Sequence, residues 1–235
     1  MKIFVVFLGL FLATACTKHG DTDPVIDTKV NMETKQLTYL ALGDSYTIGE
    51  SVPLKSNFPN QLVQQLSAKG IAVEAPQIIA RTGWTTSELQ GAIKSAAVQK
   101  KYDLVTLLIG VNNQYRGESA VTYRKEFKEL LQTAIGFAGD KTHVFVVSIP
   151  DWGVTPFGKK SGRNPETVSN EINAFNAINR EETLMAGVSY TDITPASRAA
   201  ASDLSLVADD GLHPSGKMYL DWALQVSPAV LKILK

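Results

Sequence analysis

The sequence predicts a three-layer α/β/α sandwich built on a parallel sheet of five strands. Short apolar runs alternate along the chain with longer segments that have helical spacing, which is the order of strand, crossover helix and strand in such a fold. Two of the runs, 104–109 and 144–147, contain almost no polar residues. Such runs are typical of central strands that helices cover on both faces.

The elements can be placed in order from residue 37 onward. Within the helical segment 119–137, Tyr123, Phe127, Leu130 and Ala134 recur at intervals of three or four residues and mark one buried helix face. The expected helices are 59–69, 86–100, 119–137, 165–186 and 214–234. The expected strands are 37–42, 71–80, 104–109, 144–149 and 188–193.

Composition limits the functions that the chain can have. The 235 residues are 44% hydrophobic and 20% charged, which fits one globular domain with a sizeable core. Lys plus Arg and Asp plus Glu both total 23, so no basic excess favours a nucleic-acid partner. The single cysteine, Cys16, excludes an internal disulfide framework and a thiolate metal site. We expect a monomer without metal or cofactor.

The first 36 residues have the character of a leader and a tether. Residues 1–15 combine Lys2 with an apolar run that is too short to span a bilayer, as in an export signal. The segment 12–16 resembles a bacterial lipobox, although Ala13 holds the place where Leu is usual. We therefore expect Cys16 to be lipidated and residues 16–36 to form a flexible tether in the cell envelope. The alternative is cleavage as a simply secreted, soluble protein.

Four polar segments are expected at one rim of the domain. In a parallel sheet, ligands bind beyond the carboxyl ends of the strands. Gly43-Asp44-Ser45-Tyr46 follows the first strand, and segments 81–84 and 110–113 follow the second and third. The segment 209–214 precedes the last helix.

These segments contain the groups that acyl transfer from an ester requires. A serine hydroxyl needs a base, and His213 is the one well-placed histidine of three, since His19 lies in the tether and His143 begins a strand. Asp210, three residues earlier, can hold the imidazole. Ser45 is then the nucleophile. The candidate oxyanion donors are the backbone amides of Ser45 and Gly83 and the side-chain amide of Asn112.

This set of residues resembles the SGNH, or GDSL-type, hydrolases. That family has a Ser in a Gly-Asp-Ser motif, then a Gly, an Asn, and a His in an Asp-x-x-His motif, which here are Ser45, Gly83, Asn112, and His213 with Asp210. The resemblance covers residues 37–235. It implies a flavodoxin-like sheet of strand order 2-1-3-4-5 and metal-free ester hydrolysis. Asn113 departs from the family, which usually has Asp there.

Each motif also has a purely structural interpretation. Gly, Asp and Asn are ordinary turn and helix-cap residues after strands, and Asp44 is expected mainly to brace the nucleophile turn. The order of all the motifs, each at a strand end, favours function over coincidence. Side chains near the rim could also line the substrate site. These candidates are Asp44, Trp84, Asn113, Tyr115 and Trp152.

The residues leave three functions open. The first is an esterase that removes short acyl groups, such as acetyl, from carbohydrate. The second is a lysophospholipase or fatty-acyl esterase, which needs a long apolar groove. The third, of another class, is a non-catalytic module that binds glycan or lipid. Motifs for nucleotide, dinucleotide and zinc-protease sites are absent from the sequence.

Overall fold

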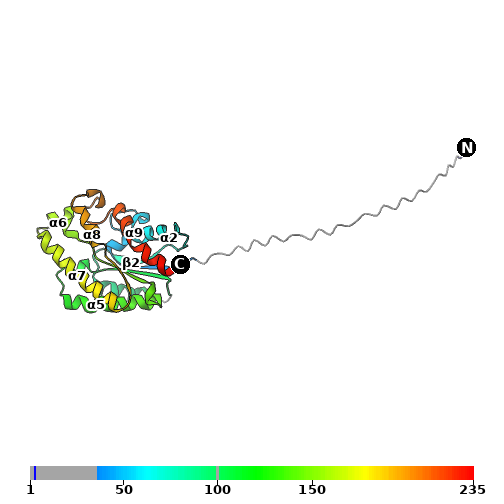
Figure 1. The fold of residues 1–235 in the computed structure, drawn as a ribbon, viewed down its shortest axis with the longest axis horizontal. Coiled ribbons are helices and arrows are strands. Elements are labelled where there is room, and N and C mark those ends of the chain that lie inside the picture. The colour runs from blue at the N-terminus through cyan, green and yellow to red at the C-terminus, as the bar shows by residue number, and fades with distance from the viewer. Residues whose placement is uncertain (1–2, 4–35, 99–100) are drawn as a thin grey trace. The chain divides into compact units, whose positions relative to one another are not determined.

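The computed structural model describes residues 3, 36–98 and 101–235 and contains the predicted parallel sheet. The strand order is β2-β1-β3-β4-β5, and every neighbouring pair is parallel. The fold class is confirmed, since helices lie on both sides of the sheet (Figure 1), and the strand order implied by the resemblance is confirmed as well. The strands are β1 (Tyr39–Asp44), β2 (Gln77–Arg81), β3 (Leu104–Leu108), β4 (Val144–Val147) and β5 (Ser189–Thr191).

Five long helices cover the two faces of the sheet. Two of them, α2 and α9, pack against each other on one face, while α5 packs against both α3 and α7 on the other (Figure 1). Each helix begins at a side-chain cap, as short polar residues before a helix predict. The helices are α2 (Phe58–Ser67), α3 (Thr86–Ala96), α5 (Ala120–Ala138), α7 (Pro165–Met185) and α9 (Gly216–Leu234).

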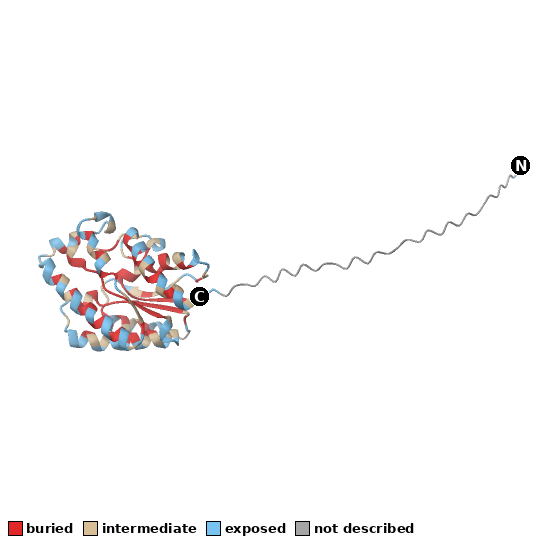
Figure 2. Cartoon of the chain, viewed as in Figure 1, coloured by how far each residue is buried: buried red, intermediate tan, exposed pale blue. Residues whose placement is uncertain are grey.

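The core lies between the sheet and these helices (Figure 2). All residues of β1, β3 and β4 are buried, as their apolar runs predict. On α9, Trp222 is fully buried, and on α5 the predicted face of Tyr123 and Phe127 points into the core. The buried strands give the rim of the sheet a rigid base.

Two elements differ most from their predicted ranges. The second strand begins at Gln77 and not at residue 71, because Pro76 has no N–H for the ladder and only an isolated bridge joins Val73 to Leu37. Helix α3 ends at Ala96, since Ala97 adopts a left-handed conformation with φ +46°. The other long elements agree within a few residues.

The described residues also form short helices and 3-10 turns that the sequence did not predict, and most of them follow the carboxyl ends of strands. They are too short and too polar to show a periodic pattern. The α-helical ones are α1 (Ser45–Ile48), α4 (Val111–Tyr115), α6 (Pro156–Lys160) and α8 (Thr194–Ser197). The 3-10 turns are η1 (Leu54–Ser56), η2 (Lys141–His143), η3 (Trp152–Val154), η4 (Arg198–Ala201) and η5 (Leu204–Leu206).

The expected export signal, the tether and lipidation at Cys16 fall on residues 1–36, almost all of which lie outside the described residues. Among the helices that the structure describes, none combines the length and apolarity needed to cross a membrane.

Candidate active site

Ser45 sits where β1 turns directly into α1. Asp44 ends the strand and caps the helix, since its Oδ1 accepts a hydrogen bond from the Tyr46 amide at 3.0 Å. Gly43 allows the tight turn, because a Cβ there would lie 2.1 Å from the Thr47 hydroxyl and 2.3 Å from the carbonyl oxygen of Leu108. The nucleophile candidate is therefore held on a short, closely packed turn.

His213 and Asp210 reach this serine from near the other end of the chain. The Nε2 of His213 lies 2.9 Å from the Oγ of Ser45, and Nδ1 lies 2.6 Å from Oδ2 of Asp210. Ser45 and His213 are 4% and 6% exposed, so solvent competes little for their hydrogen bond. The ring of Tyr46 packs on that of His213 with centroids 5.1 Å apart. This is the geometry of a serine, a base and an orienting carboxylate.

Asp210 is set up to remain ionised. Partial burial raises its pKa, but hydrogen bonds from the His213 ring, from the backbone amides of Leu212 and His213 and from the Ser51 hydroxyl together hold the pKa at about 2. A permanent negative charge beside Nδ1 keeps the proton on that nitrogen and leaves Nε2 free to accept one from serine.

The other aspartate of the site lies in a different environment. Asp44 is fully buried, and this burial raises the pKa of its carboxyl to about 7, although hydrogen bonds from the Tyr46 amide, its own amide and the Asn112 side chain act in the opposite direction. Its hydrogen bond from the Tyr46 amide nevertheless braces the turn, as expected for Asp44.

The oxyanion candidates gather around the same cavity as Ser45. Both Gly83 and Asn112 line it. Gly83 has φ +85°, and the guanidinium of Arg116 fixes its peptide by donating to its carbonyl oxygen at 2.6 Å. The Nδ2 of Asn112 donates to the carbonyl oxygen of Trp84 at 2.9 Å and, over a longer 3.4 Å, to Oδ2 of Asp44, so an oxyanion would have to take over the second of these contacts.

The cavity beside Ser45 has a volume of about 190 Å³ and a largely apolar wall. Of the five side chains expected to line it, the structure places Tyr115 and Trp152 there. Asp44 and Asn113 are fully buried instead, and Trp84 packs half-buried against the core. These three were expected at the cavity because they are close in sequence to the motif residues, but burial among other side chains takes them out of its wall.

Asn113 has a structural role that its sequence position did not reveal. Its Oδ1 accepts from the Thr86 amide at 3.1 Å, and its Nδ2 donates to the Thr86 hydroxyl at 2.6 Å and to Glu118 at 2.7 Å. The side chain thereby ties α4 to the start of α3. Asn113 therefore orders the oxyanion loop in the place where the resembling family usually has a carboxylate.

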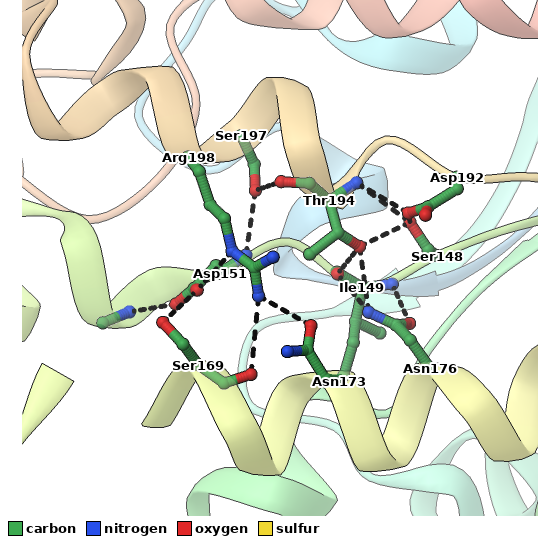
Figure 3. A network of polar contacts seen from close by, with 11 residues as sticks. Ser148, Ile149, Asp151, Ser169, Asn173, Asn176, Asp192, Thr194, Ser197 and Arg198 are labelled. Carbon is green, nitrogen blue, oxygen red and sulfur yellow. Dashed lines mark hydrogen bonds and ion pairs between the residues drawn. The ribbon is translucent and has the colours of Figure 1, made fainter. Parts of the chain in front are cut away.

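A buried polar network holds the wall that carries Trp152. Asp151, directly before it, is 1% exposed and accepts from Arg198 at 2.9 Å, from Ser169 at 2.6 Å and from the Gly153 amide (Figure 3). The indole Nε1 of Trp152 donates to Gln114 at 2.7 Å. Asp151 therefore has a structural role, and Trp152 faces the cavity.

Sequence reasoning missed several residues at the cavity. Leu212 could have been found, because it lies between Asp210 and His213. Phe157 was not missed in the same way, since its position after the fourth strand left open a role in the core or in the wall of this rim; the structure places it in the wall, with its ring centroid 6.0 Å from that of Trp152 and 6.4 Å from that of Tyr115. The remaining lining residues are Tyr46, Thr82 and Val111. In the part of the chain that the structure describes, no group of three or more His, Cys, Asp or Glu side chains could hold a metal ion.

A parallel α/β/α fold that brings a serine, a histidine and an aspartate together at one rim of its sheet is typical of serine hydrolases. The model of the GDSL-like lipase/acylhydrolase family matches residues 41–220, and the chain belongs to this family. Membership supports an ester hydrolase that acts on carboxylic esters. A search of curated protein sequences found no match.

Solved structures share the fold at low sequence identity. The lipase Lip_vut3 from a goat rumen metagenome superposes with a TM-score of 0.69 at 19% identity, covering 85% of this chain and 100% of that one. The lipase/acylhydrolase from Enterococcus faecalis gives 0.65 at 18%, covering 85% and 98%. A variant of Axe2, an acetyl xylan esterase from Geobacillus stearothermophilus, gives 0.64 at 14%, covering 83% and 94%. One fold thus carries enzymes of different substrate preference.

Proposed function

We propose that the chain is a serine esterase that forms an acyl-enzyme on Ser45 and removes short acyl groups from carbohydrate. The observation that carries this proposal is the alignment of Ser45, His213 and Asp210 at 2.9 and 2.6 Å beside a small cavity. The reaction needs a nucleophile, a base and oxyanion donors, and the site offers a candidate for each.

In the first half-reaction the Ser45 oxygen attacks the acyl carbon while Nε2 of His213 takes the hydroxyl proton. The carbonyl oxygen becomes an oxyanion, which the amides of Ser45 and Gly83 and the Asn112 side chain would stabilise. The imidazolium returns the proton to the leaving alcohol as the ester bond breaks. Water then attacks the acyl-enzyme with His213 again as base, and the acid is released as Ser45 is regenerated.

The cavity supports a short acyl group. Its volume of about 190 Å³ is below the roughly 300–1,000 Å³ of sites that enclose drug-sized ligands. Tyr115 and Phe157 are 49% and 37% exposed, so they offer apolar ring faces to the alcohol half of the ester. Exposed aromatic faces of this kind can pack against the C–H groups of a sugar ring.

The test is Ser45→Ala together with a series of p-nitrophenyl esters from acetate to palmitate. We expect Ser45→Ala to lower kcat at least ~10⁴-fold without loss of folding, and the wild type to prefer acetate. Ser95→Ala, at an exposed serine on α3, is the matched control.

Three outcomes of this test would change the assignment. Equal turnover by Ser45→Ala and wild type would refute the mechanism. A preference for palmitate would assign the protein to fatty-acyl or lysophospholipid esters. A wild type without turnover that still binds acetylated glycan would point to the binding module instead.

We also propose that the chain is exported and anchored in the bacterial envelope through lipid on Cys16. The apolar segment before this cysteine and the polar stretch after it support the proposal.

A further inference from the structure

The turn that follows the nucleophile helix, residues Gly49 to Val52, contacts the other catalytic segments. Glu50 accepts a hydrogen bond from the hydroxyl of Thr82, the residue before Gly83. Ser51 donates its hydroxyl to Oδ2 of Asp210 at 2.8 Å, across 159 residues of sequence. The turn therefore links the segment of the nucleophile to the oxyanion loop and to the acid.

The backbone of this turn is fixed from several sides. Gly49 closes α1 with its amide 3.1 Å from the Ser45 carbonyl oxygen, and a Cβ on it would lie 2.3 Å from that of Asn57. The Asn57 side chain in turn donates to the carbonyl oxygen of Ile48 at 2.9 Å. These contacts leave Ser51 little freedom to relax.

Ser51 is held in an unfavourable conformation. Its φ is +65°, and Ser51 and Ala97 are the non-glycine residues with positive φ in the described ranges. Glycine would adopt this conformation without a steric penalty. A strained residue that provides a side-chain contact at a site is a sign of function, because the strain persists only when its surroundings impose it. Here the contact that glycine could not provide is the hydrogen bond to Asp210.

We propose that Ser51 is a positioning residue for Asp210, an inference that rests on the proposed function. The hydroxyl occupies the second lone pair of Oδ2, the oxygen that also binds Nδ1 of His213. The Ser51 hydroxyl fixes the orientation of Oδ2 and lowers the basicity of the Asp210 carboxylate. The neighbouring Glu50 and Asp209 are acidic, so neither can replace the hydroxyl as a donor.

The decisive comparison is between Ser51→Gly and Ala97→Gly. Both relieve a positive φ, so both should leave the melting temperature equal to or above that of wild type. Only Ser51→Gly loses a hydrogen bond to a charged group, and we expect its kcat to fall about tenfold with KM little changed. Without the hydroxyl Asp210 holds the imidazolium more tightly, so the acid limb of the kcat/KM profile should move to higher pH. Ala97→Gly should change neither kcat nor the position of the acid limb.

Ser51→Ala keeps the backbone strain and loses the hydroxyl, so it should match Ser51→Gly in kcat while melting at a lower temperature. Wild-type kcat in both variants, or a lower kcat with an unmoved acid limb, would overturn the proposal. Ser45→Ala, assayed in parallel, keeps this outcome distinct from failure of the proposed function, since an active Ser45→Ala enzyme would refute that function itself.

Discussion

Asp44 and Asp210 have the same side chain, but their surroundings shift its pKa in opposite directions. Asp44 is enclosed by the core, and its pKa rises to about 7, whereas four donors around Asp210 hold its pKa at about 2. At neutral pH the charge beside His213 is therefore permanent. The Asp44 carboxyl, which precedes Ser45 in the chain, becomes charged only as the pH approaches 7.

This difference predicts how Asp44 affects stability. Between about pH 4 and 7 the folded chain keeps the Asp44 proton and the unfolded chain releases it, so Asp44 lowers the free energy of unfolding as pH rises. Asn mimics the neutral carboxyl and can cap α1. We expect the stability of Asp44→Asn relative to wild type to increase by ~2–4 kcal/mol as the pH rises from 4 to 7.

The measurement is chemical denaturation of both proteins across this pH range. A stability difference that does not change with pH would contradict the raised pKa of Asp44.

The short elements around the sheet depend on contacts between side chains. Asn113 links α4 to α3 and donates to the Glu118 carboxylate at 2.7 Å. In Asn113→Asp this hydrogen bond would become a repulsion, and the Thr86 hydroxyl could not compensate, because it donates to Glu126. We expect Asn113→Asp to lose ~1.5–3 kcal/mol of stability near pH 7 and to recover part of it below about pH 4, as a carboxyl gains a proton.

Thermal or urea unfolding of the double variant Asn113→Asp with Glu118→Gln provides the control. The amide introduced by Glu118→Gln restores a donor to the new carboxylate, so stability should return toward that of wild type. If the double variant were no more stable than Asn113→Asp alone, the contact would not be the cause.

The sequence alone predicted the long elements and the serine, histidine and aspartate that the structure brings together. The short elements and the contacts between loops could not be predicted, for physical reasons. Buried strands such as β3 appear as apolar runs, and the four motifs locate Ser45 and His213 at one rim of the sheet. Helices of four or five residues have no period, so α1 and α4 were not predicted. The contacts of Ser51, Asn113 and Phe157 join loops that are remote in the chain, and only three-dimensional structure reveals them.

At the scale of the whole molecule, the proposed anchor adds a testable property. If Cys16 is lipidated, the intact mass of the mature protein should equal residues 16–235 plus a diacylglyceryl and an N-acyl group. Cys16→Ser should carry no lipid and leave the membrane fraction, with kcat on p-nitrophenyl acetate unchanged. Mass spectrometry of detergent-extracted protein measures this, and an unmodified thiol at Cys16 would exclude the anchor.

The proposed nucleophile, Ser45, and its proposed base, His213, are separated by 168 residues. During synthesis Ser45 emerges early, long before the ribosome has reached the codon for His213. On the proposed mechanism, a growing polypeptide contains an unactivated Ser45 hydroxyl until the segment with His213 has been made and folded. If Ser45 and His213 act as proposed, ester hydrolysis can begin only after the chain has been made beyond residue 213, and no amino-terminal fragment that ends before that residue can carry it out.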